Sequence, residues 1–156
     1  MNKSFVLILD NIRSVENTGS IFRTADGLGV NKIILVGTTP VPIDRFGRKR
    51  NDFIKVSLGA EDSVEWEYIK DIKSAIKDLK EQNFQIIALE QADNSVDLNT
   101  FKPKDQFALV VGNEVDGVSK EALDLMDELV EIKMKGMKES LNVSVATGIA
   151  LYNLTE

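Results

Sequence analysis

The sequence contains no cysteine and no histidine. The lack of cysteine excludes disulfides and thiolate nucleophiles, and the lack of both residues excludes most zinc sites and all imidazole acid–base chemistry. Any catalysis must therefore use carboxylates, arginine, lysine, hydroxyls, amides or backbone dipoles. A chain without disulfides also fits a reducing compartment, so a cytoplasmic location is expected.

Long hydrophobic runs are missing from the start of the chain as well. The N-terminal stretch has only five consecutive apolar residues, Phe5 to Leu9. This run is too short for the hydrophobic part of a signal peptide or for a membrane span. We therefore expect a buried strand here and no membrane partner.

The length and composition fit one domain over residues 1–156, because 43% of the residues are hydrophobic and 28% are charged. The net charge of −6 argues against a general nucleic-acid coat protein. The charge is unevenly spread: residues 1–60 have a net charge of +4, residues 61–132 of −11 and residues 133–156 of +1. Two interpretations fit: the two ends form a basic working surface, or the acidic middle is simply a solvated outer face.

Short apolar runs alternate with helix-like segments along the chain. Strands are expected at residues 4–10, 32–37, 84–90, 107–112 and 129–134. Helices are expected at residues 17–30 (capped by Thr18), 63–83, 119–128 and 140–154, and loops at residues 38–53 and 91–106. This order is typical of an α/β fold with a mostly parallel sheet and helices on both faces. Ligands bind such sheets beyond the carboxyl ends of the strands, where several polar stretches occur.

The stretch NTGSIFR, residues 17–23, is the first candidate site. Gly19 allows a tight turn into a helix whose N-terminus offers free amides. Arg23 is expected about one turn inside that helix, within reach of Asn17, and its planar fork of donors suits phosphate. A capped helix with Arg23 in a surface ion pair fits the same residues.

The stretch VVGNEVDGVS, residues 110–119, is the second candidate. A buried strand ends at Gly112, which allows a ligand to approach the backbone closely, and Glu114 follows. A carboxylate at a strand end is a common site of function, but a helix-start carboxylate stabilised by the dipole explains Glu114 equally well. Neither the dinucleotide-binding glycine pattern nor a P-loop occurs in the chain.

The stretch KESLNVSVATGIALY, residues 138–152, is the third candidate. Ser140, Asn142 and Ser144 alternate with apolar residues, yet one helix cap saturates only one or two amides. Some of these polar side chains are therefore expected to face a ligand. A helix with a redundant polar start is the alternative.

Together, the three stretches resemble the SpoU (TrmH) family of RNA ribose 2′-O-methyltransferases, within the SPOUT superfamily. The family has Asn, Gly and Arg in its first motif, Gly-x-Glu-x-x-Gly after an apolar strand in its second, and Ile-Pro-Met before Ser-Leu-Asn-Val-Ser in its third. The matching residues are Asn17, Gly19, Arg23, Gly112, Glu114, Gly117, Ile132, Met134 and residues 140–144. The chain departs from the family at Lys133, where proline is usual.

This resemblance implies a C-terminal deep trefoil knot whose loops hold S-adenosylmethionine. The implied cofactor-binding residues are Leu89, Gly112, Ile132, Met134, Ser140 and Leu141. The implied reaction is methyl transfer from the sulfonium to a ribose 2′-hydroxyl, and no metal is needed for it.

The implied catalytic residues are Arg23, Asn17, Glu114 and Asn142. The resemblance points to Arg23 as the base or phosphate-assisted base, but arginine stays protonated throughout the accessible pH range, so a phosphate-positioning role is favoured. Family members work as homodimers in which the arginine motif of one subunit faces the cofactor site of the other. Residues 143–152 are expected at that interface, in the core, or in both.

Many relatives carry an additional N-terminal RNA-binding domain. This chain starts at its first strand, so we expect no such extension and expect the catalytic domain alone to hold the RNA, either tRNA or rRNA. The candidates for phosphate contacts lie in the run RFGRKR and are Arg45, Arg48, Lys49 and Arg50. A solvated loop fits this run equally well.

Two other functions fit parts of the sequence. A non-catalytic RNA-binding or assembly protein would keep the fold, although the intact residues at the three motifs argue against it. A nucleotide-binding flavodoxin-like domain is the other alternative, but the phosphate loop that it needs is missing.

Overall fold

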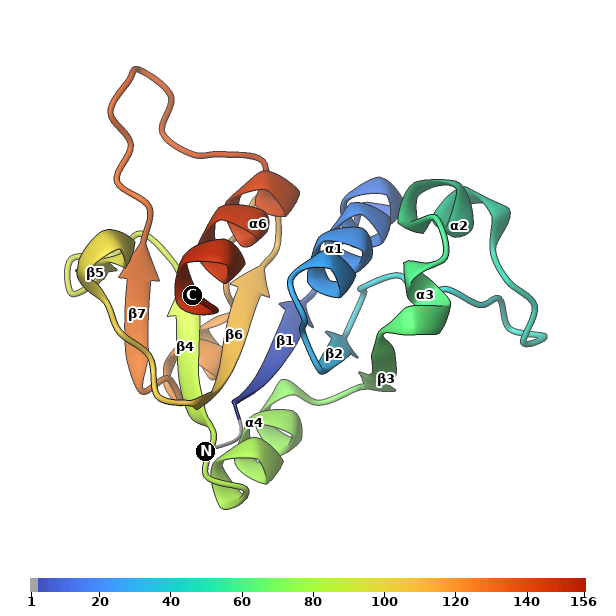
Figure 1. Cartoon of the computed structure of the whole chain (residues 1–156), viewed down its shortest axis with the longest axis horizontal. Helices are drawn as coiled ribbons and strands as arrows, with labels where there is room; N and C mark the ends of the chain where they lie inside the picture. Colours follow the sequence, from blue (N-terminus) through green and yellow to red (C-terminus); the bar gives the residue numbers. More distant parts are fainter. Residues whose placement is uncertain (1–2) are drawn as a thin grey trace.

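The computed structural model describes residues 3–156 of the chain. Its centre is one seven-stranded sheet with the order β3-β2-β1-β6-β4-β7-β5, in which every neighbouring pair is parallel (Figure 1). The strands are β1 Ser4–Asp10, β2 Lys32–Val36, β3 Glu65–Ile69, β4 Gln85–Leu89, β5 Val96–Asp97, β6 Gln106–Gly112 and β7 Glu128–Glu131. The expected α/β fold with a mostly parallel sheet is confirmed.

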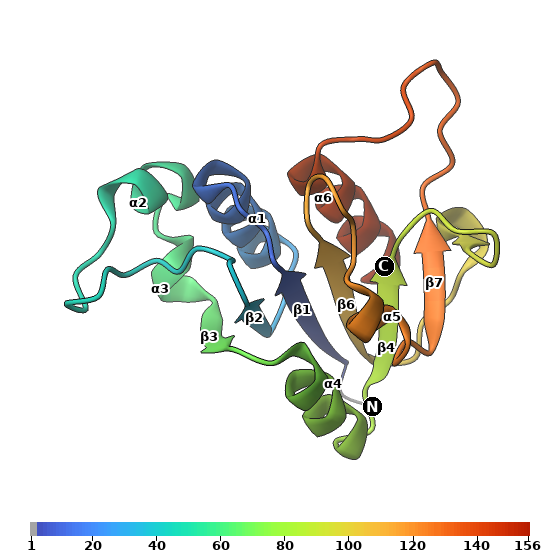
Figure 2. The ribbon, with the colours of Figure 1, turned by 180° about the vertical axis from the view of Figure 1, so that it is seen from behind.

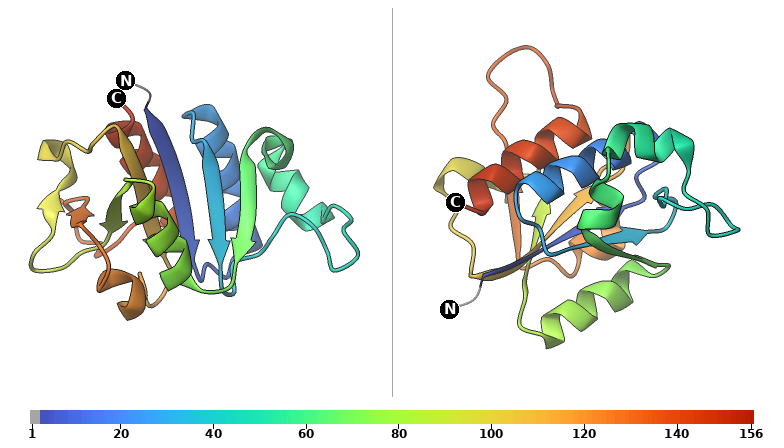
Figure 3. Two further views of the ribbon diagram at one scale, coloured as in Figure 1. Left: turned by 90° about the horizontal axis from the view of Figure 1, so that it is seen from below. Right: turned by 45° about the vertical axis from the view of Figure 1, so that its right-hand side comes forward.

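Helices cover both faces of this sheet, as Figures 2 and 3 show. The helices on one face are α1 Val15–Gly27, α2 Asn51–Ser57, α3 Ala60–Ser63 and α6 Val143–Leu154. The helices on the other face are α4 Ile72–Glu81 and α5 Lys120–Leu123. A 3₁₀ turn, η1 Leu98–Thr100, follows β5. Within residues 3–156, each helix is too short or too polar to cross a membrane.

The neighbouring strands β1 and β6 form the centre of the core. Leu7, Ile8 and Leu109 are fully buried, and two clusters of apolar side chains fill the two sides of the sheet. Strands of a parallel sheet are buried on both faces, so they read as continuous apolar runs rather than as an alternation. This is why the short run near the N-terminus predicts a strand so clearly.

The start of α1 differs from the prediction. The helix begins at Val15, and its N-cap is Ser14, whose Oγ accepts a hydrogen bond from the Asn17 amide at 3.0 Å. Thr18 is therefore not a cap; it is buried in the helix, and its hydroxyl donates to the Ser14 carbonyl. Gly19 does not form a turn either. A Cβ at that position would lie 3.0 Å from the Cβ of Val56, so the glycine allows α1 and α2 to pack closely.

The predicted helix over residues 63–83 is only half correct. Its second half is α4, but residues 65–69 form β3, an edge strand that pairs with β2. The segment EWEYI alternates between acidic and larger apolar side chains, and Trp66 packs against the core while Lys32 pairs with the neighbouring glutamates. The helical spacing of Ile69, Ile72, Ile76 and Leu79 predicts one long helix, but EWEYI also fits a period of two, and pairing with β2 decides the outcome.

The expected loops also contain short regular elements. Helix α2 begins inside the 38–53 segment, and β5 with η1 lies inside the 91–106 segment. A seven-residue helix and a two-residue strand carry too few periods to be recognised from a repeating pattern, whereas buried strands of similar length are recognised by their continuous apolar runs.

Candidate active site

The carboxyl ends of the parallel strands lie at one edge of the sheet and border a pocket of about 470 Å³. Its walls come from the ends of β4 and β6, the loop after β6, the segment after β7 and the start of α6. All six predicted cofactor residues line it: Leu89, Gly112, Ile132, Met134, Ser140 and Leu141. The fold thus brings together side chains from segments that are far apart in the sequence.

Glu114, in the loop after β6, holds the start of α1. Its Oε1 accepts a hydrogen bond from the Arg13 amide at 3.1 Å, and its Oε2 accepts from the Ser14 amide at 3.1 Å and from Asn17 Nδ2 at 3.2 Å. Burial alone would raise the pKa of this carboxyl, but hydrogen bonds from its own amide and from Arg13, Asn17 and Ser14 lower the pKa below its ordinary 4.5. Glu114 is therefore an anion with its acceptor sites largely occupied.

Asn142 joins this cluster from the other end of the chain. Its Nδ2 donates to Asn17 Oδ1 at 3.2 Å, while its Oδ1 accepts from the Ser144 amide at 2.8 Å and from the Ser144 hydroxyl at 2.6 Å. Asn142 is thus the N-cap of α6 and also the link between α6 and α1. The polar alternation in residues 140–144 has three uses: Asn142 caps, Ser144 supports the cap, and Ser140 faces the pocket.

The loop after β6 closes on itself in a tight antiparallel bridge between Asn113 and Gly117. The Asn113 Oδ1 accepts from the amides of Val115 and Asp116 at 2.8 and 3.0 Å, and its Nδ2 donates to the Asn11 carbonyl at 2.8 Å. Gly112 is needed for this closure, because a Cβ there would lie 2.2 Å from the Gly117 carbonyl carbon. The loop backbone therefore requires this glycine. Gly112 also lines the pocket, so close approach of a ligand there stays a prediction.

Two further carboxylates hold the far end of this loop. Asp10, buried at the end of β1, accepts from the Ser119 amide at 2.8 Å, and Glu90, just after β4, accepts from the Val118 amide at 2.8 Å. Sequence reasoning gave neither residue a role, although Glu90 begins one of the polar stretches that follow the strands. The available signal was the same one that identified Glu114: a carboxylate at the end of an apolar strand in a parallel sheet.

Arg23 lies apart from the pocket. It is the ninth residue of α1 and therefore sits in the third turn, not one turn inside the helix as predicted, because the helix begins at Val15. Its side chain is exposed, and among residues 3–156 it makes no hydrogen bond or ion pair. Asn17 instead bonds to Glu114 and Asn142. Within this chain, no hydrogen bond or ion pair joins Arg23 to the other three predicted catalytic residues among residues 3–156.

The basic run lies in the connection from β2 to α2, outside the pocket. Three of its four predicted phosphate-binding cations are paired with carboxylates. Arg48 contacts Asp44 at 3.1 Å and Arg50 contacts Asp52 at 2.8 Å. Lys49 contacts Glu61 at 3.4 Å and also donates a hydrogen bond to Asp62. The bond to Asp62 raises the pKa of Lys49. Arg45 is paired with no carboxylate in the described part of the chain and instead lies against the ring of Phe46.

Residues 4–152 match the model of a family described as the SpoU rRNA Methylase family. The chain belongs to this family. The SpoU resemblance carried by the three motifs is thereby confirmed over nearly the whole chain. In this SpoU chain, the motif residues Asn17, Glu114 and Asn142 lie up to 125 positions apart and are joined by hydrogen bonds at the pocket.

Two curated relatives of this SpoU chain act on different RNAs. The 23S rRNA (guanosine-2′-O-)-methyltransferase RlmB of Escherichia coli (strain K12) is 35% identical over 153 residues, covering 97% of this chain and 60% of that protein. The tRNA (guanosine(18)-2′-O)-methyltransferase of Aquifex aeolicus is 34% identical over 154 residues, covering 96% of this chain and 68% of that protein. The chain thus spans about 60% of the length of the E. coli relative.

Two solved structures share the fold of this chain. The A. aeolicus TrmH/SpoU tRNA modifying enzyme superposes with a TM-score of 0.85 at 32% identity, covering 99% of this chain and 75% of that one. An AdoMet-bound rRNA methyltransferase from Sinorhizobium meliloti superposes with a TM-score of 0.86 at 29% identity, covering 98% of this chain and 56% of that one.

Proposed function

We propose that this chain is the catalytic domain of an RNA ribose 2′-O-methyltransferase that uses S-adenosylmethionine. The observation that carries the proposal is the hydrogen-bonded cluster of Glu114, Asn17 and Asn142 at the edge of a pocket built from the second and third motifs. The names of the relatives support methylation of a guanosine 2′-hydroxyl in rRNA or tRNA.

The pocket fits S-adenosylmethionine in size and charge. A volume of about 470 Å³ is within the range of small-molecule sites, and the walls combine apolar side chains with polar ones such as Gln91 and Ser140. The described lining contains four carboxylates, Glu90, Glu114, Asp116 and Glu131, and no lysine or arginine. An acidic pocket favours a sulfonium cation and disfavours the phosphates of a flavin or a nucleoside triphosphate. This charge argues against the flavodoxin-like alternative.

When bound, S-adenosylmethionine supplies an activated methyl group, so the protein must mainly align the ribose and assist the loss of its 2′-hydroxyl proton. Glu114 is a weak base for this step because its pKa is lowered and its oxygens already accept three hydrogen bonds. We assign it a positioning role: it fixes Asn17, which in turn fixes Asn142. Arg23 is assigned to a phosphate beside the ribose.

We also propose that two copies of the chain share the site. A shallow groove between α1 and α6 is lined by Ser20, Thr24, Val145, Ile149 and Tyr152, among others. Arg23 lies three residues after Ser20 and next to Thr24, so it borders this groove. A second copy packed on the groove would place Arg23 near a pocket other than its own. The family resemblance supports this arrangement, and it supports the deep trefoil knot in the same way.

The first experiment is calorimetric titration of the purified protein with S-adenosylmethionine and S-adenosylhomocysteine. Saturable binding of one ligand per subunit is expected. If neither ligand binds even at high concentration, the proposed use of the pocket is contradicted and a non-catalytic RNA-binding protein is favoured.

The second experiment tests Arg23 with labelled S-adenosylmethionine and total tRNA or rRNA as methyl acceptor. Arg23→Ala is expected to lower methyl transfer by about a hundredfold or more while leaving ligand binding unchanged. Lys55→Ala is the matched control, because it also removes an exposed cation, in this case from α2. It is expected to retain the wild-type rate. Methyl transfer by Arg23→Ala at the wild-type rate would remove Arg23 from the mechanism.

A further inference from the structure

A tight hairpin in the connection from β2 to α2 presents an aromatic ring to solvent. Residues 43–49 form this hairpin, which is closed by an antiparallel bridge between Ile43 and Lys49. At its tip Phe46 is 67% exposed, the largest such fraction for any aromatic side chain among residues 3–156. A ring kept in water at the end of a loop has no role in the core of this chain.

The hairpin holds this ring in a defined place. Asp44 accepts from the amides of Phe46 and Arg48 at 2.8 and 3.0 Å, and its own amide donates to the Arg48 carbonyl at 2.8 Å. Gly47 adopts a φ of 79°, which lets the chain reverse directly after the ring. Lys49 ties the base of the hairpin to Glu61 of α3. The exposure of Phe46 is thus built into the local structure.

Two exposed arginines lie over the ring. The guanidinium carbons of Arg45 and Arg48 lie 4.9 and 5.1 Å from the centre of the Phe46 ring. An aromatic face beside planar guanidinium groups is the surface on which proteins stack unpaired bases of single-stranded nucleic acid. The tip therefore offers a base a stacking surface made of the Phe46 ring and the guanidinium groups over it.

The charges around the hairpin add little net attraction for phosphates. Arg48, Lys49 and Arg50 are each paired with carboxylates of the same region, which leaves Arg45 as the cation without an acidic partner in the described chain. Phosphate attraction depends on unneutralised charge. Most of the affinity of this hairpin for RNA would then come from stacking on Phe46.

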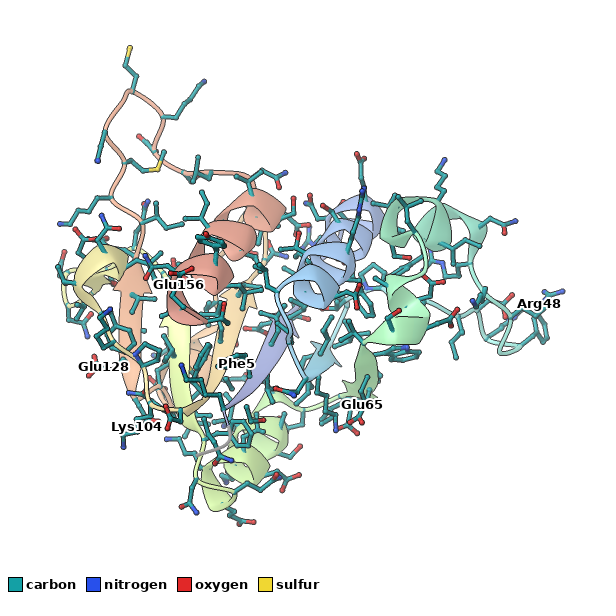
Figure 4. All side chains as sticks on the ribbon, viewed as in Figure 1. Phe5, Arg48, Glu65, Lys104, Glu128 and Glu156 are labelled. Atoms are coloured by element: carbon teal, nitrogen blue, oxygen red, sulfur yellow. The ribbon has the colours of Figure 1, made fainter. Side chains whose placement is uncertain are left out.

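We propose that Phe46, flanked by Arg45 and Arg48, stacks on an unpaired base of the RNA. This inference rests on the proposed function, because it takes RNA to be the partner. The stacked base is not the methylated nucleotide of the same subunit: Figure 4 shows Arg48 at one extreme of the molecule, far from the 132–142 loop beside the pocket. The hairpin is thus a second contact that orients the RNA at a distance from the reaction.

The test is a fluorescence anisotropy titration with labelled oligoadenylate of about 12 nucleotides, a length within the range that single-stranded binding sites cover. Phe46→Ala is expected to weaken binding about tenfold, the loss expected for one stacked base. Phe46→Trp is expected to restore the affinity. Leu58→Ala, which removes a side chain of similar exposure (61%) from the end of α2, is the matched control and is expected to bind as wild type.

An abasic oligomer of the same length separates stacking from charge. The wild type and Phe46→Ala are expected to bind it equally weakly, because it offers phosphates without bases. Phe46→Trp adds a direct signal: the natural chain has a single tryptophan, Trp66, so quenching by oligoadenylate beyond that of the wild type reports stacking at position 46.

Three outcomes would overturn the inference: equal oligoadenylate affinity of Phe46→Ala and wild type, an equal loss on the abasic oligomer, or no binding of oligoadenylate by the wild type. Titration of the same samples with S-adenosylmethionine keeps the two proposals apart. Binding of that ligand with no effect of Phe46 on RNA would leave the methyltransferase standing and make the ring a candidate contact for a protein partner.

Discussion

Helices α4 and α6 lie on opposite faces of the same sheet and differ in how they use their surfaces. The ten-residue α4 buries Ile72, Ile76 and Leu79 and turns charged side chains to solvent. The twelve-residue α6 buries Ala150, Leu151 and Leu154, yet its opposite side is apolar too. Val145, Ile149 and Tyr152 on that side are 51%, 43% and 62% exposed.

This difference shows what each helix needs in order to be stable. The pattern of α4 is complete within one chain, since an apolar stripe faces the core and a charged face meets water. A helix that is apolar all round is normally buried all round. We therefore expect another protein surface to cover the apolar outer side of α6, and this is the physical argument for the proposed dimer.

The two N-caps differ in the same sense. Asp71 caps α4 by accepting from the Lys73 amide at 3.1 Å, a contact within its own helix. Asn142 caps α6 and in addition donates to Asn17 of α1. One cap serves local stability alone, whereas the other also serves the pocket.

The largest expected effect comes from placing a charge on the outer side of α6. In a dimer, Ile149→Asp would bury one unpaired carboxylate from each copy, at a total cost of at least about 4 kcal/mol, or roughly a thousandfold in the dissociation constant. Ser74→Asp on the outer face of α4 is the matched control and is expected to change nothing. Sedimentation equilibrium measures both. A monomeric wild type, or a dimer that tolerates Ile149→Asp, would remove the interface from α6.

The next effect distinguishes the two caps. Asn142→Ala and Asp71→Ala are each expected to lower the free energy of unfolding by about 1 kcal/mol, the usual contribution of a cap. Only Asn142→Ala is expected to reduce methyl transfer, by about a hundredfold, because it also releases Asn17. Urea denaturation together with a methylation assay tests the pair. Equal activity of the two variants would mean that the link to α1 has no catalytic consequence.

A smaller effect concerns the pH dependence of the cluster to which the α6 cap belongs. The pKa of Glu114 is lower in the folded chain than its ordinary 4.5. The ionised carboxylate therefore contributes fully to stability above about pH 4.5, and this contribution is lost as the pH falls through the lowered pKa of the folded state. Glu114→Gln is expected to cost about 1–2 kcal/mol at neutral pH and progressively less in acid.

Urea denaturation of the wild type and the Glu114→Gln variant from neutral to acidic pH measures this convergence. Glu16→Gln is the control, because Glu16 is an exposed carboxylate in the first turn of α1, the turn that Glu114 holds. Its free energy of unfolding is expected to differ little from that of the wild type at every pH. A constant cost of Glu114→Gln across the range would show that charge is unimportant at this position.

The sequence predicted the interior of this fold better than its edges. The apolar runs at β1, β4 and β6 are unmistakable because both sides of those strands are buried. The edge strand β3 was predicted to be helix, because one of its sides meets solvent and Ile69 at its end continues the helical spacing of the apolar residues in α4. Its pairing with β2 is a contact between distant segments, which local patterns do not specify.

The sequence predicted which residues form the site, but it did not predict the hydrogen bonds that join them. Motif resemblance identified Asn17, Glu114 and Asn142, and the structure joins all three. The bonds themselves span about a hundred positions, so no local spacing encodes them. The trefoil knot stays a prediction for a related reason: strand order and pairing state which elements touch, and they do not specify the path by which the chain passes between them.

The smallest effect concerns the segments that lead into the two helices. Two residues, 70–71, connect β3 to α4, whereas residues 132–142 form a long loop before α6, and Lys133 there replaces the proline usual in the family. Lys133 pairs with Glu131 at 3.3 Å, and its side chain is 60% exposed. An exposed pair of this kind contributes less than about 1 kcal/mol.

Lys133→Pro and Lys133→Ala are therefore both expected to change the affinity for S-adenosylmethionine by less than about fivefold, with the proline variant the tighter of the two because it restricts the free loop. Calorimetry measures both, and Lys70→Ala before α4 is the control. A large loss with proline would mean that the loop of this chain follows a path that proline cannot adopt. The walls of the pocket would then differ locally from those of its relatives.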